Sequence, residues 1–176
     1  MTRMRISVTD PSLVLLVGPS GAGKSTFAKA HFPSLAVLSS DELRAVIAGD
    51  PNDQSASAEA FGVLALLIDG RLRRRLLTVV DATSLRRESR RRWLRMARRH
   101  GLPAVTICFD YPISTYLELN RRRPGRRVEE DVVRDQAARM AAALADLSAE
   151  GWDGRYVLAS PEAAAAAEVT LVGPPG

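Results

Sequence analysis

A glycine-rich segment near the start of the chain has the composition and spacing of a phosphate-binding loop. It runs GPSGAGKS from Gly18 to Ser25 and matches G-x-x-x-x-G-K-[ST] in full. The glycines let the backbone turn tightly, so that its N–H groups can point inward at phosphate oxygens. Lys24 is expected to reach the β- and γ-phosphates of a nucleotide, and the Ser25 hydroxyl to bind Mg²⁺.

The flanking segments support this interpretation over a chance glycine turn. Leu13 to Val17 is an uninterrupted apolar run that predicts a buried strand. A helix is expected from about Lys24 to Ala30, and its N-terminal end adds positive potential beside the phosphates. The residues assigned to nucleotide binding are Gly18, Pro19, Ser20, Gly21, Ala22, Gly23, Lys24, Ser25 and Thr26.

An acidic residue at the end of a second apolar run could complete a magnesium site. Leu76 to Val80 predicts a buried strand, and Asp81 follows it directly. A carboxylate in that position can hold Mg²⁺ directly or through water. Many strands end in aspartate, but the phosphate-binding loop upstream favours Ser25 and Asp81 as the metal-binding residues.

Asp41 and Arg44 are candidates for the acceptor side of a phosphoryl transfer. Leu35 to Leu38 predicts a strand, and Ser39-Ser40-Asp41 is expected to cap a helix through about Ala48. Asp41 could take a proton from an attacking hydroxyl, and Arg44, one turn later, could bind an anion on the acceptor. An aspartate N-cap with an i,i+3 ion pair is the alternative, and spacing alone leaves both open.

A dense basic segment, Arg121 to Arg127, lies between two helical patterns. We expect a lid over about residues 119–128, in which an arginine such as Arg123 would neutralise charge on the transferring phosphoryl group. Arg126 is assigned to nucleotide binding with it. A solvated basic turn, or a nonspecific patch for polyanions, is the alternative.

The remaining patterns predict one α/β domain over residues 1–176. Apolar runs alternate with helical spacing, which is typical of a three-layer α/β/α fold around a parallel sheet of about five strands. Further strands are expected at Pro103–Phe109 and Tyr156–Leu158, with a possible edge strand in the tail at 168–176. Further helices are expected at Ala56–Arg74, Arg86–His100, Ile113–Asn120 and Val128–Glu150.

Composition narrows the class of protein. The 176 residues are 46% hydrophobic and 26% charged, as in an ordinary globular domain, and no apolar segment is long enough to span a membrane. The net charge of +5 suits a polyanionic partner, although an arginine- and alanine-rich codon bias would have the same effect. Most arginines of the 86–100 helix are expected on a solvated surface. Cys108, the single cysteine, is expected to be a buried thiol, which fits a cytoplasmic protein.

These motifs together resemble the kinase module of bacterial end-healing polynucleotide kinase–phosphatases, which is related to phage polynucleotide kinase. The matching stretches are GPSGAGKSTF at 18–27, Ser39-Ser40-Asp41 with Arg44, NDQ at 52–54, TVVDAT at 78–83, Arg123, and RRVEE at 126–130. The resemblance extends from about Leu13 to Glu162. The phosphate-binding loop is common to many kinases, and the SSD-x-x-R and NDQ stretches are more specific.

The resemblance implies Mg²⁺-dependent transfer of phosphate from ATP (or GTP) to the 5′-hydroxyl end of RNA or DNA. It implies Asp41 as the general base, Arg44 as a clamp on the acceptor's neighbouring phosphate, and Arg123 as a lid arginine. The sequence departs from the family at Leu119, where an arginine is usual, and at Ser84, where asparagine is usual. The family's phosphatase and ligase modules are not part of these 176 residues.

Two other functions remain open. A kinase for a small-molecule hydroxyl, on a sugar, nucleoside or antibiotic, would use the same catalytic residues. A nucleotide-gated binding module without catalysis would retain the phosphate-binding loop and use the lid as a switch. The oligomeric state and the choice between RNA and DNA are also left open.

Overall fold

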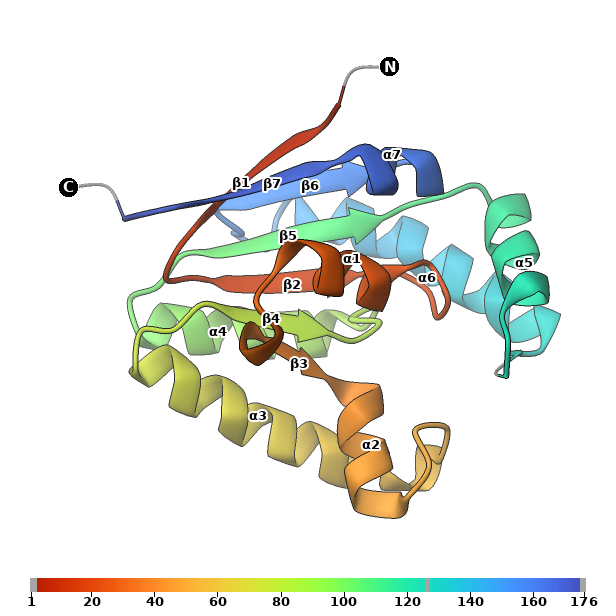
Figure 1. Ribbon diagram of the computed structural model, residues 1–176, viewed down its shortest axis with the longest axis horizontal. Coiled ribbons are helices and arrows are strands. Elements are labelled where there is room, and N and C mark those ends of the chain that lie inside the picture. Colours follow the sequence, from red (N-terminus) through yellow and green to blue (C-terminus); the bar gives the residue numbers. More distant parts are fainter. Residues whose placement is uncertain (1–2, 126, 175–176) are drawn as a thin grey trace.

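The computed structural model describes residues 3–125 and 127–174, and within them five parallel strands form a central sheet (Figure 1). The strands are β2 (Leu13–Val17), β3 (Val37–Ser39), β4 (Thr78–Asp81), β5 (Ala104–Phe109) and β6 (Gly154–Leu158), in the order β3-β4-β2-β5-β6. All residues of β2, β4 and β5 are buried. Strands covered on both faces must be apolar on both faces, which explains their uninterrupted hydrophobic runs.

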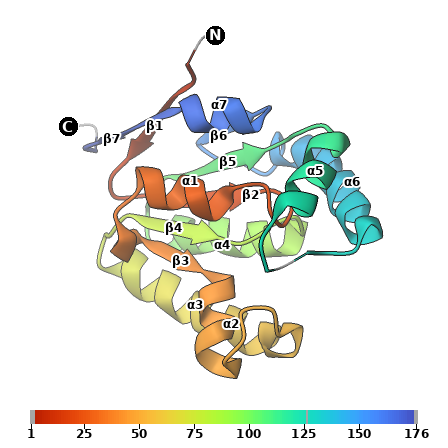
Figure 2. The same cartoon turned by 45° about the vertical axis from the view of Figure 1, so that its right-hand side comes forward.

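Helices cover both faces of this sheet, which confirms the predicted three-layer α/β/α fold (Figures 1 and 2). The helices are α1 (Lys24–His31), α2 (Ser40–Ala48), α3 (Ser57–Arg73), α4 (Arg87–Arg99), α5 (Ile113–Arg122), α6 (Glu130–Leu147) and α7 (Pro161–Ala166). One core cluster joins the sheet to α1 and α5 through Phe27 and Tyr116. The other joins it to α3, α4 and α6 through Leu64, Trp93 and Met140.

The tail adds its strand to a second small sheet. β7 (Glu168–Val172) pairs in parallel with β1 (Arg5–Thr9), with Ile6 opposite Val169. No strand was predicted at 5–9, although the alternation there is visible: Ile6 and Val8 are buried and their neighbours are not. α7 was also missed, and Ser160 caps it by accepting a hydrogen bond from the Ala163 N–H at 3.1 Å.

Some boundaries differ from those predicted. The strand expected at Leu35–Leu38 begins at Val37, because a 3₁₀ turn occupies Ser34–Ala36 and leaves Leu35 84% exposed. α5 continues through Arg122, so the basic segment is partly helical. The Asn120 amide holds the segment that follows by bonding both the N–H and the C=O of Val128, at 3.0 and 2.7 Å.

Two further findings concern membrane spans and the single cysteine. Within residues 3–125 and 127–174, no helix is long and apolar enough to cross a bilayer. Cys108 is a buried free thiol on β5, as expected. Burial raises the pKa of this thiol to about 11.

Candidate active site

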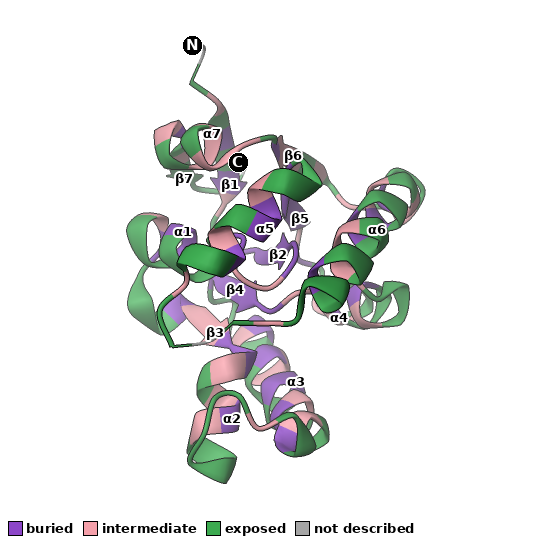
Figure 3. Cartoon of the chain, turned by 90° about the vertical axis from the view of Figure 1, so that its right-hand side faces the viewer, coloured by how far each residue is buried: buried purple, intermediate pink, exposed green. Residues whose placement is uncertain are grey.

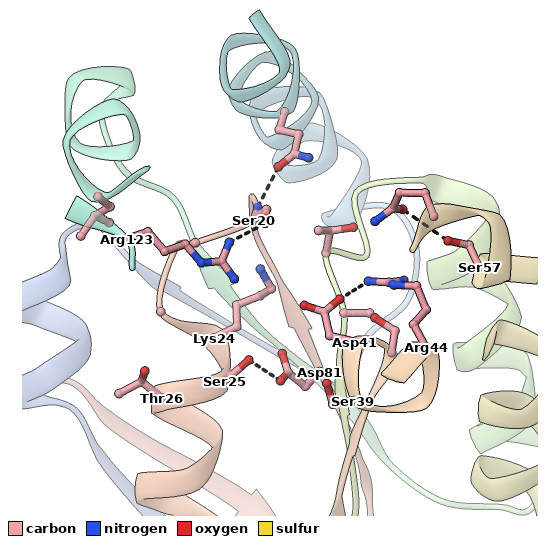
Figure 4. Close-up of a pocket in the computed structure, with 18 of the residues that line it drawn as sticks. Ser20, Lys24, Ser25, Thr26, Ser39, Asp41, Arg44, Ser57, Asp81 and Arg123 are labelled. Atoms are coloured by element: carbon pink, nitrogen blue, oxygen red, sulfur yellow. Dashed lines mark hydrogen bonds and ion pairs between the residues drawn. The ribbon is translucent and has the colours of Figure 1, made fainter. Parts of the chain in front are cut away.

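A cavity of about 500 Å³ opens at the carboxyl ends of the central strands, and most of the predicted site residues line it (Figure 4). Seen from this side of the molecule, β2, β4 and β5 are buried behind more exposed helices (Figure 3). Its walls come from the loop between β2 and α1, the start of α2, the end of β4, the start of α3, and the segment after α5. In an open parallel sheet this edge is where loops converge and ligands bind. The predicted site residues among these walls are Ser20, Gly21, Gly23, Lys24, Ser25, Thr26, Asp41, Arg44, Asp81 and Arg123.

The phosphate-binding loop has the backbone that its glycines permit. Gly21 and Gly23 have φ of 81° and 91°, a region that other residues rarely adopt. A Cβ on Gly18 would lie 3.0 Å from the Cβ of Phe109, so glycine is also needed there for packing against β5. Lys24 is buried, and its ammonium donates to the carbonyl oxygens of Gly18 and Pro19 at 2.9 and 2.6 Å. The loop therefore surrounds a cation placed at its centre.

Ser25 and Asp81 come together as predicted. The Ser25 hydroxyl donates to Asp81 Oδ2 at 2.6 Å, and Asp81 is buried at the end of β4. Hydroxyl and carboxylate oxygens are hard ligands that suit Mg²⁺, which typically uses one or two protein ligands and completes its shell with phosphate oxygens and water. The described residues contain no group of three or more acidic, histidine or cysteine side chains that could hold a metal by itself. The pair therefore fits a magnesium ion that arrives with a nucleotide.

Asp41 and Arg44 form an ion pair on the opposite wall (Figure 4). Arg44 is buried, and its Nε donates to the carbonyl oxygen of Pro51 at 3.1 Å, so the guanidinium is held from two sides. Asp41 keeps 42% of its side chain exposed. Ser39, rather than Asp41, caps α2 by accepting from the Glu42 N–H at 3.3 Å. The capping role is therefore wrong for Asp41, while the ion pair is confirmed, and both side chains face the cavity.

The predicted lid contributes Arg123 to the site. Its Nη1 donates to the Ser20 hydroxyl at 3.1 Å, directly over the phosphate-binding loop. Arg121 and Arg122 are exposed and pair with Glu130 and Glu118, although Arg122 also borders the cavity. Arg126 lies outside the described residues. Leu119, where the resembled family has arginine, lines the cavity with an apolar side chain.

Four more residues of the cavity wall were given no role by the sequence analysis. Gln136 on α6 accepts a hydrogen bond from the Ser20 N–H at 2.7 Å. Gln54, Ser57 and Phe61 line the wall next to Arg44, and the Ser57 hydroxyl donates to Gln54 Oε1 at 3.3 Å. Gln54 belongs to the NDQ stretch, which the family resemblance had singled out. Gln136 is one polar residue of a long helix, and no sequence pattern distinguished it.

A second cavity, of about 410 Å³, adjoins the first and is mainly apolar. It shares Gly21, Gly23, Thr26 and Leu119 with the first cavity. The rest of its wall comes from α1, α7 and the segment after β5, with the residues Ala22, Phe27, Ala30, His31, Tyr111, Pro161, Ala164 and Ala165. An apolar slot that opens beside a phosphate-binding loop suits a planar ring such as a nucleotide base.

A buried arginine fixes the loop that follows Asp81. Arg90 on α4 is fully buried, and its Nη1 donates to the carbonyl oxygens of Ser84 and Leu85 at 3.2 and 2.8 Å. Its Nη2 donates to Glu150 at 2.7 Å. The same loop meets the phosphate-binding loop, because the Gly18 N–H donates to the Thr83 carbonyl at 3.0 Å. Arg90 is thus an exception to the expected solvated surface of this helix.

The fold and the site together define the class of protein: a P-loop protein with the kinase fold. A family model described as an AAA domain matches residues 13–147, and the chain belongs to that family. The matched region contains the phosphate-binding loop, Asp41, Asp81 and the predicted lid. Among curated proteins, none matches the sequence.

Solved structures share this fold at low sequence identity. The Pnkp1/Rnl/Hen1 RNA repair complex contains a chain that is 18% identical, with a TM-score of 0.61, covering 82% of this chain and 47% of that one. Shikimate kinase from Acinetobacter baumannii is 18% identical, with a TM-score of 0.55 and coverages of 88% and 87%. A sugar kinase from Janibacter sp. HTCC2649 is 17% identical, with a TM-score of 0.51 and coverages of 92% and 84%. At these identities the likeness establishes the fold.

Proposed function

We propose that this protein transfers the γ-phosphoryl group of ATP (or GTP) to a hydroxyl group, and that its acceptor is the 5′-hydroxyl end of a nucleic acid. The observation that carries the proposal is the arrangement of one cavity between two walls. A phosphate-binding loop with the Ser25–Asp81 pair forms one wall, and the Asp41–Arg44 pair forms the other. A donor phosphate on the first wall and an acceptor hydroxyl on the second would face each other.

The donor side has the groups that a nucleoside triphosphate needs. Lys24 and the backbone N–H groups of the loop would bind the phosphates, while the apolar second cavity would hold the base. Ser25 and Asp81 would hold Mg²⁺, which when bound neutralises charge on the phosphate oxygens. Arg123 would move from the Ser20 hydroxyl to the transferring phosphoryl group, a short shift within the same cavity.

The chemical step needs a base beside the acceptor oxygen. Asp41 is exposed enough to be reached from the cavity, and Arg44 fixes its carboxylate. As the acceptor oxygen bonds to the γ-phosphorus, the bond from that phosphorus to the β–γ bridging oxygen breaks, and ADP leaves. The proton of the hydroxyl passes to Asp41. A base in this position contributes about 100- to 10,000-fold to the rate.

A 5′-terminal nucleoside suits the acceptor wall. Phe61 offers a ring on which a base can stack, and Gln54 and Ser57 offer polar groups to a sugar or base edge. Arg44 could share its charge between Asp41 and the first phosphate of the strand. The resemblance to end-healing kinases and the fold shared with a chain of the RNA repair complex support the same acceptor.

The test measures transfer from γ-labelled ATP with Mg²⁺ to a 5′-hydroxyl oligonucleotide, for wild type, Asp41→Asn and Glu42→Gln. Glu42 is the matched control, because it is the next residue of α2 but is exposed and does not line the cavity. We expect Asp41→Asn to lose at least about 100-fold in transfer rate while ATP binding by calorimetry is unchanged, and Glu42→Gln to remain active.

Two results would overturn parts of the proposal. ATP binding with no label on the oligonucleotide, but with Asp41-dependent transfer to a metabolite, would replace the nucleic acid by a small-molecule acceptor. ATP binding without transfer to any acceptor would indicate a binding module. Acceptor binding should also weaken steeply with salt if strand phosphates contribute, and a neutral small molecule would lack that dependence.

A further inference from the structure

The middle of the outward face of α3 is apolar and is not covered by any other described part of the chain. α3 forms the outer edge of the molecule, beyond β3 (Figure 1). Leu66, at the middle of the helix, is 75% exposed, and Val63 and Leu67 are 38% and 40% exposed. We call the stripe formed by Glu59, Gly62, Val63, Leu66, Gly70 and Arg73 the α3 face, since their spacing of three and four residues places them on one side of the helix. The buried side of α3 is a separate stripe that includes Leu64 and Ile68.

Packing among the described residues does not account for the two glycines of the α3 face. A Cβ on Gly62 would meet no atom within 4 Å, and one on Gly70 would meet only the end of the Arg74 side chain at 4.0 Å. Each glycine in a helix costs about 1 kcal/mol relative to alanine. Where side chains at a contact are small, two helix axes can approach more closely. The glycines therefore fit a helix that packs against α3 from outside.

The charged residues of the α3 face are placed so that two antiparallel copies of the helix would bring opposite charges together. Glu59 lies in the first turn and Arg73 in the last turn, each seven residues from Leu66, and Gly62 and Gly70 are each four residues from it. Both charged side chains are exposed, and neither forms a salt bridge within the described part of the chain, although the charge of Arg73 also acts on the Asp69 carboxylate one turn earlier. If a second α3 crosses antiparallel at Leu66, Glu59 meets Arg73 of the partner subunit at both ends, and each glycine pair meets in between.

We propose that a second copy of this chain binds the α3 face, so that two α3 helices pack antiparallel about a twofold axis. In such an isologous contact one surface must be complementary to itself, and the order acid, glycine, leucine, glycine, base meets that condition. Leu66 forms the centre of the interface, where the largest contributions to binding are found. The contact leaves the cavity open, because Ser57 and Phe61 face the cavity rather than the α3 face.

The first measurement is sedimentation velocity across a wide range of protein concentration. We expect wild type to dimerise and Leu66→Glu to raise the dimer dissociation constant at least about tenfold. Leu35→Glu is the matched control, since Leu35 is 84% exposed but lies on the 3₁₀ turn before β3, and this variant should dimerise like wild type. An unchanged thermal midpoint of the Leu66→Glu monomer, measured at a dilution where wild type is also monomeric, shows that the fold is intact.

A charge reversal separates self-association from binding to another partner. Glu59→Arg or Arg73→Glu alone places like charges together at both ends of the contact and should weaken the dimer. The double variant restores opposite charges in a twofold contact and should recover much of the lost affinity. A protein that is monomeric at every concentration, a dimer unaffected by Leu66→Glu, or a double variant weaker than both single variants would overturn the proposal.

Discussion

Removal of the Glu150 carboxylate is expected to destabilise the protein far more than removal of a surface charge. Arg90 is fully buried, and its Nε and Nη2 donate to Glu150 at 2.7 to 3.2 Å. Glu150 has only 1% of its side chain exposed. In Glu150→Ala the buried guanidinium keeps its two carbonyl partners and Asp146 at 3.5 Å, but loses its main counter-charge.

The size of the effect follows from this burial. Loss of one partner of a buried ion pair costs about 3 to 5 kcal/mol. Asp146 is 39% exposed and compensates in part, so we expect the lower end, about 3 kcal/mol. For a chain of 176 residues this lowers the thermal midpoint by roughly 6 to 12 °C, at about 2 to 4 °C per kcal/mol.

Urea unfolding and calorimetry measure this difference, with Arg139→Ala as the control. Arg139 pairs with Asp135 on the same helix at 2.7 Å, but both side chains are about half exposed, so its loss should cost under about 1 kcal/mol. The double variant Arg90→Met, Glu150→Leu removes both charges and should recover most of the stability lost in Glu150→Ala. A cost below about 1 kcal/mol for Glu150→Ala would refute the reasoning.

The same pair predicts a dependence on pH. Burial raises the pKa of Glu150, but the hydrogen bonds from Arg90 and Trp152 and the charge of Arg90 outweigh it and lower the pKa overall. A carboxyl with a lowered pKa in the folded protein contributes stability above its ordinary value of 4.5, and that stability is lost as pH falls through the folded value. The free energy of unfolding of wild type should therefore fall more steeply below pH 4.5 than that of the double variant.

Two further predictions concern the lid and the core. Arg123→Ala should lower the rate of phosphoryl transfer by about 1,000-fold or more under saturating donor, measured against Arg121→Ala, whose exposed pair with Glu130 lies outside the cavity; equal rates for the two variants would remove Arg123 from the chemistry. The Cys108 thiol, with its pKa raised to about 11 by burial, should resist iodoacetamide at pH 8 in the folded protein and react once urea unfolds it, and alkylation at equal rates in both states would contradict its buried position.

The central part of the fold was predictable because its signals are local. Uninterrupted apolar runs such as Leu13–Val17 identify strands that are buried on both faces, and the glycine pattern that follows specifies one backbone shape. The carboxyl ends of parallel strands share one edge of the sheet, which was enough to bring Lys24, Asp41 and Asp81 to one cavity. The pairing of β1 with β7 was not predictable in this way, because it joins residues from the two ends of the chain.

The parts of the site that were missed depend on tertiary contacts. Arg90 is one of many arginines on α4, and only the arrival of Glu150 from the far end of α6 distinguishes it from its solvated neighbours. Phe61, near the start of α3, packs against the core and also lies on the cavity wall, and no local pattern indicated the second contact. A side chain's neighbours from another element decide its role in both cases, and a single sequence does not contain them.

These tertiary contacts make α6 the element that connects the two halves of the donor site. Gln136, in the second turn of α6, bonds the Ser20 N–H of the phosphate-binding loop, and Glu150, just after its end, holds Arg90 and thereby the loop after Asp81. Because α6 is held by hydrogen bonds at both ends, it would not move together with the lid as one rigid body. The proposed movement of Arg123 toward a phosphate would then be absorbed between α5 and α6, where Gly125 has a φ of 81° that permits a sharp turn. In the proposed mechanism α6 would therefore hold the donor-side loops in place while the segment before it accommodates the movement of Arg123.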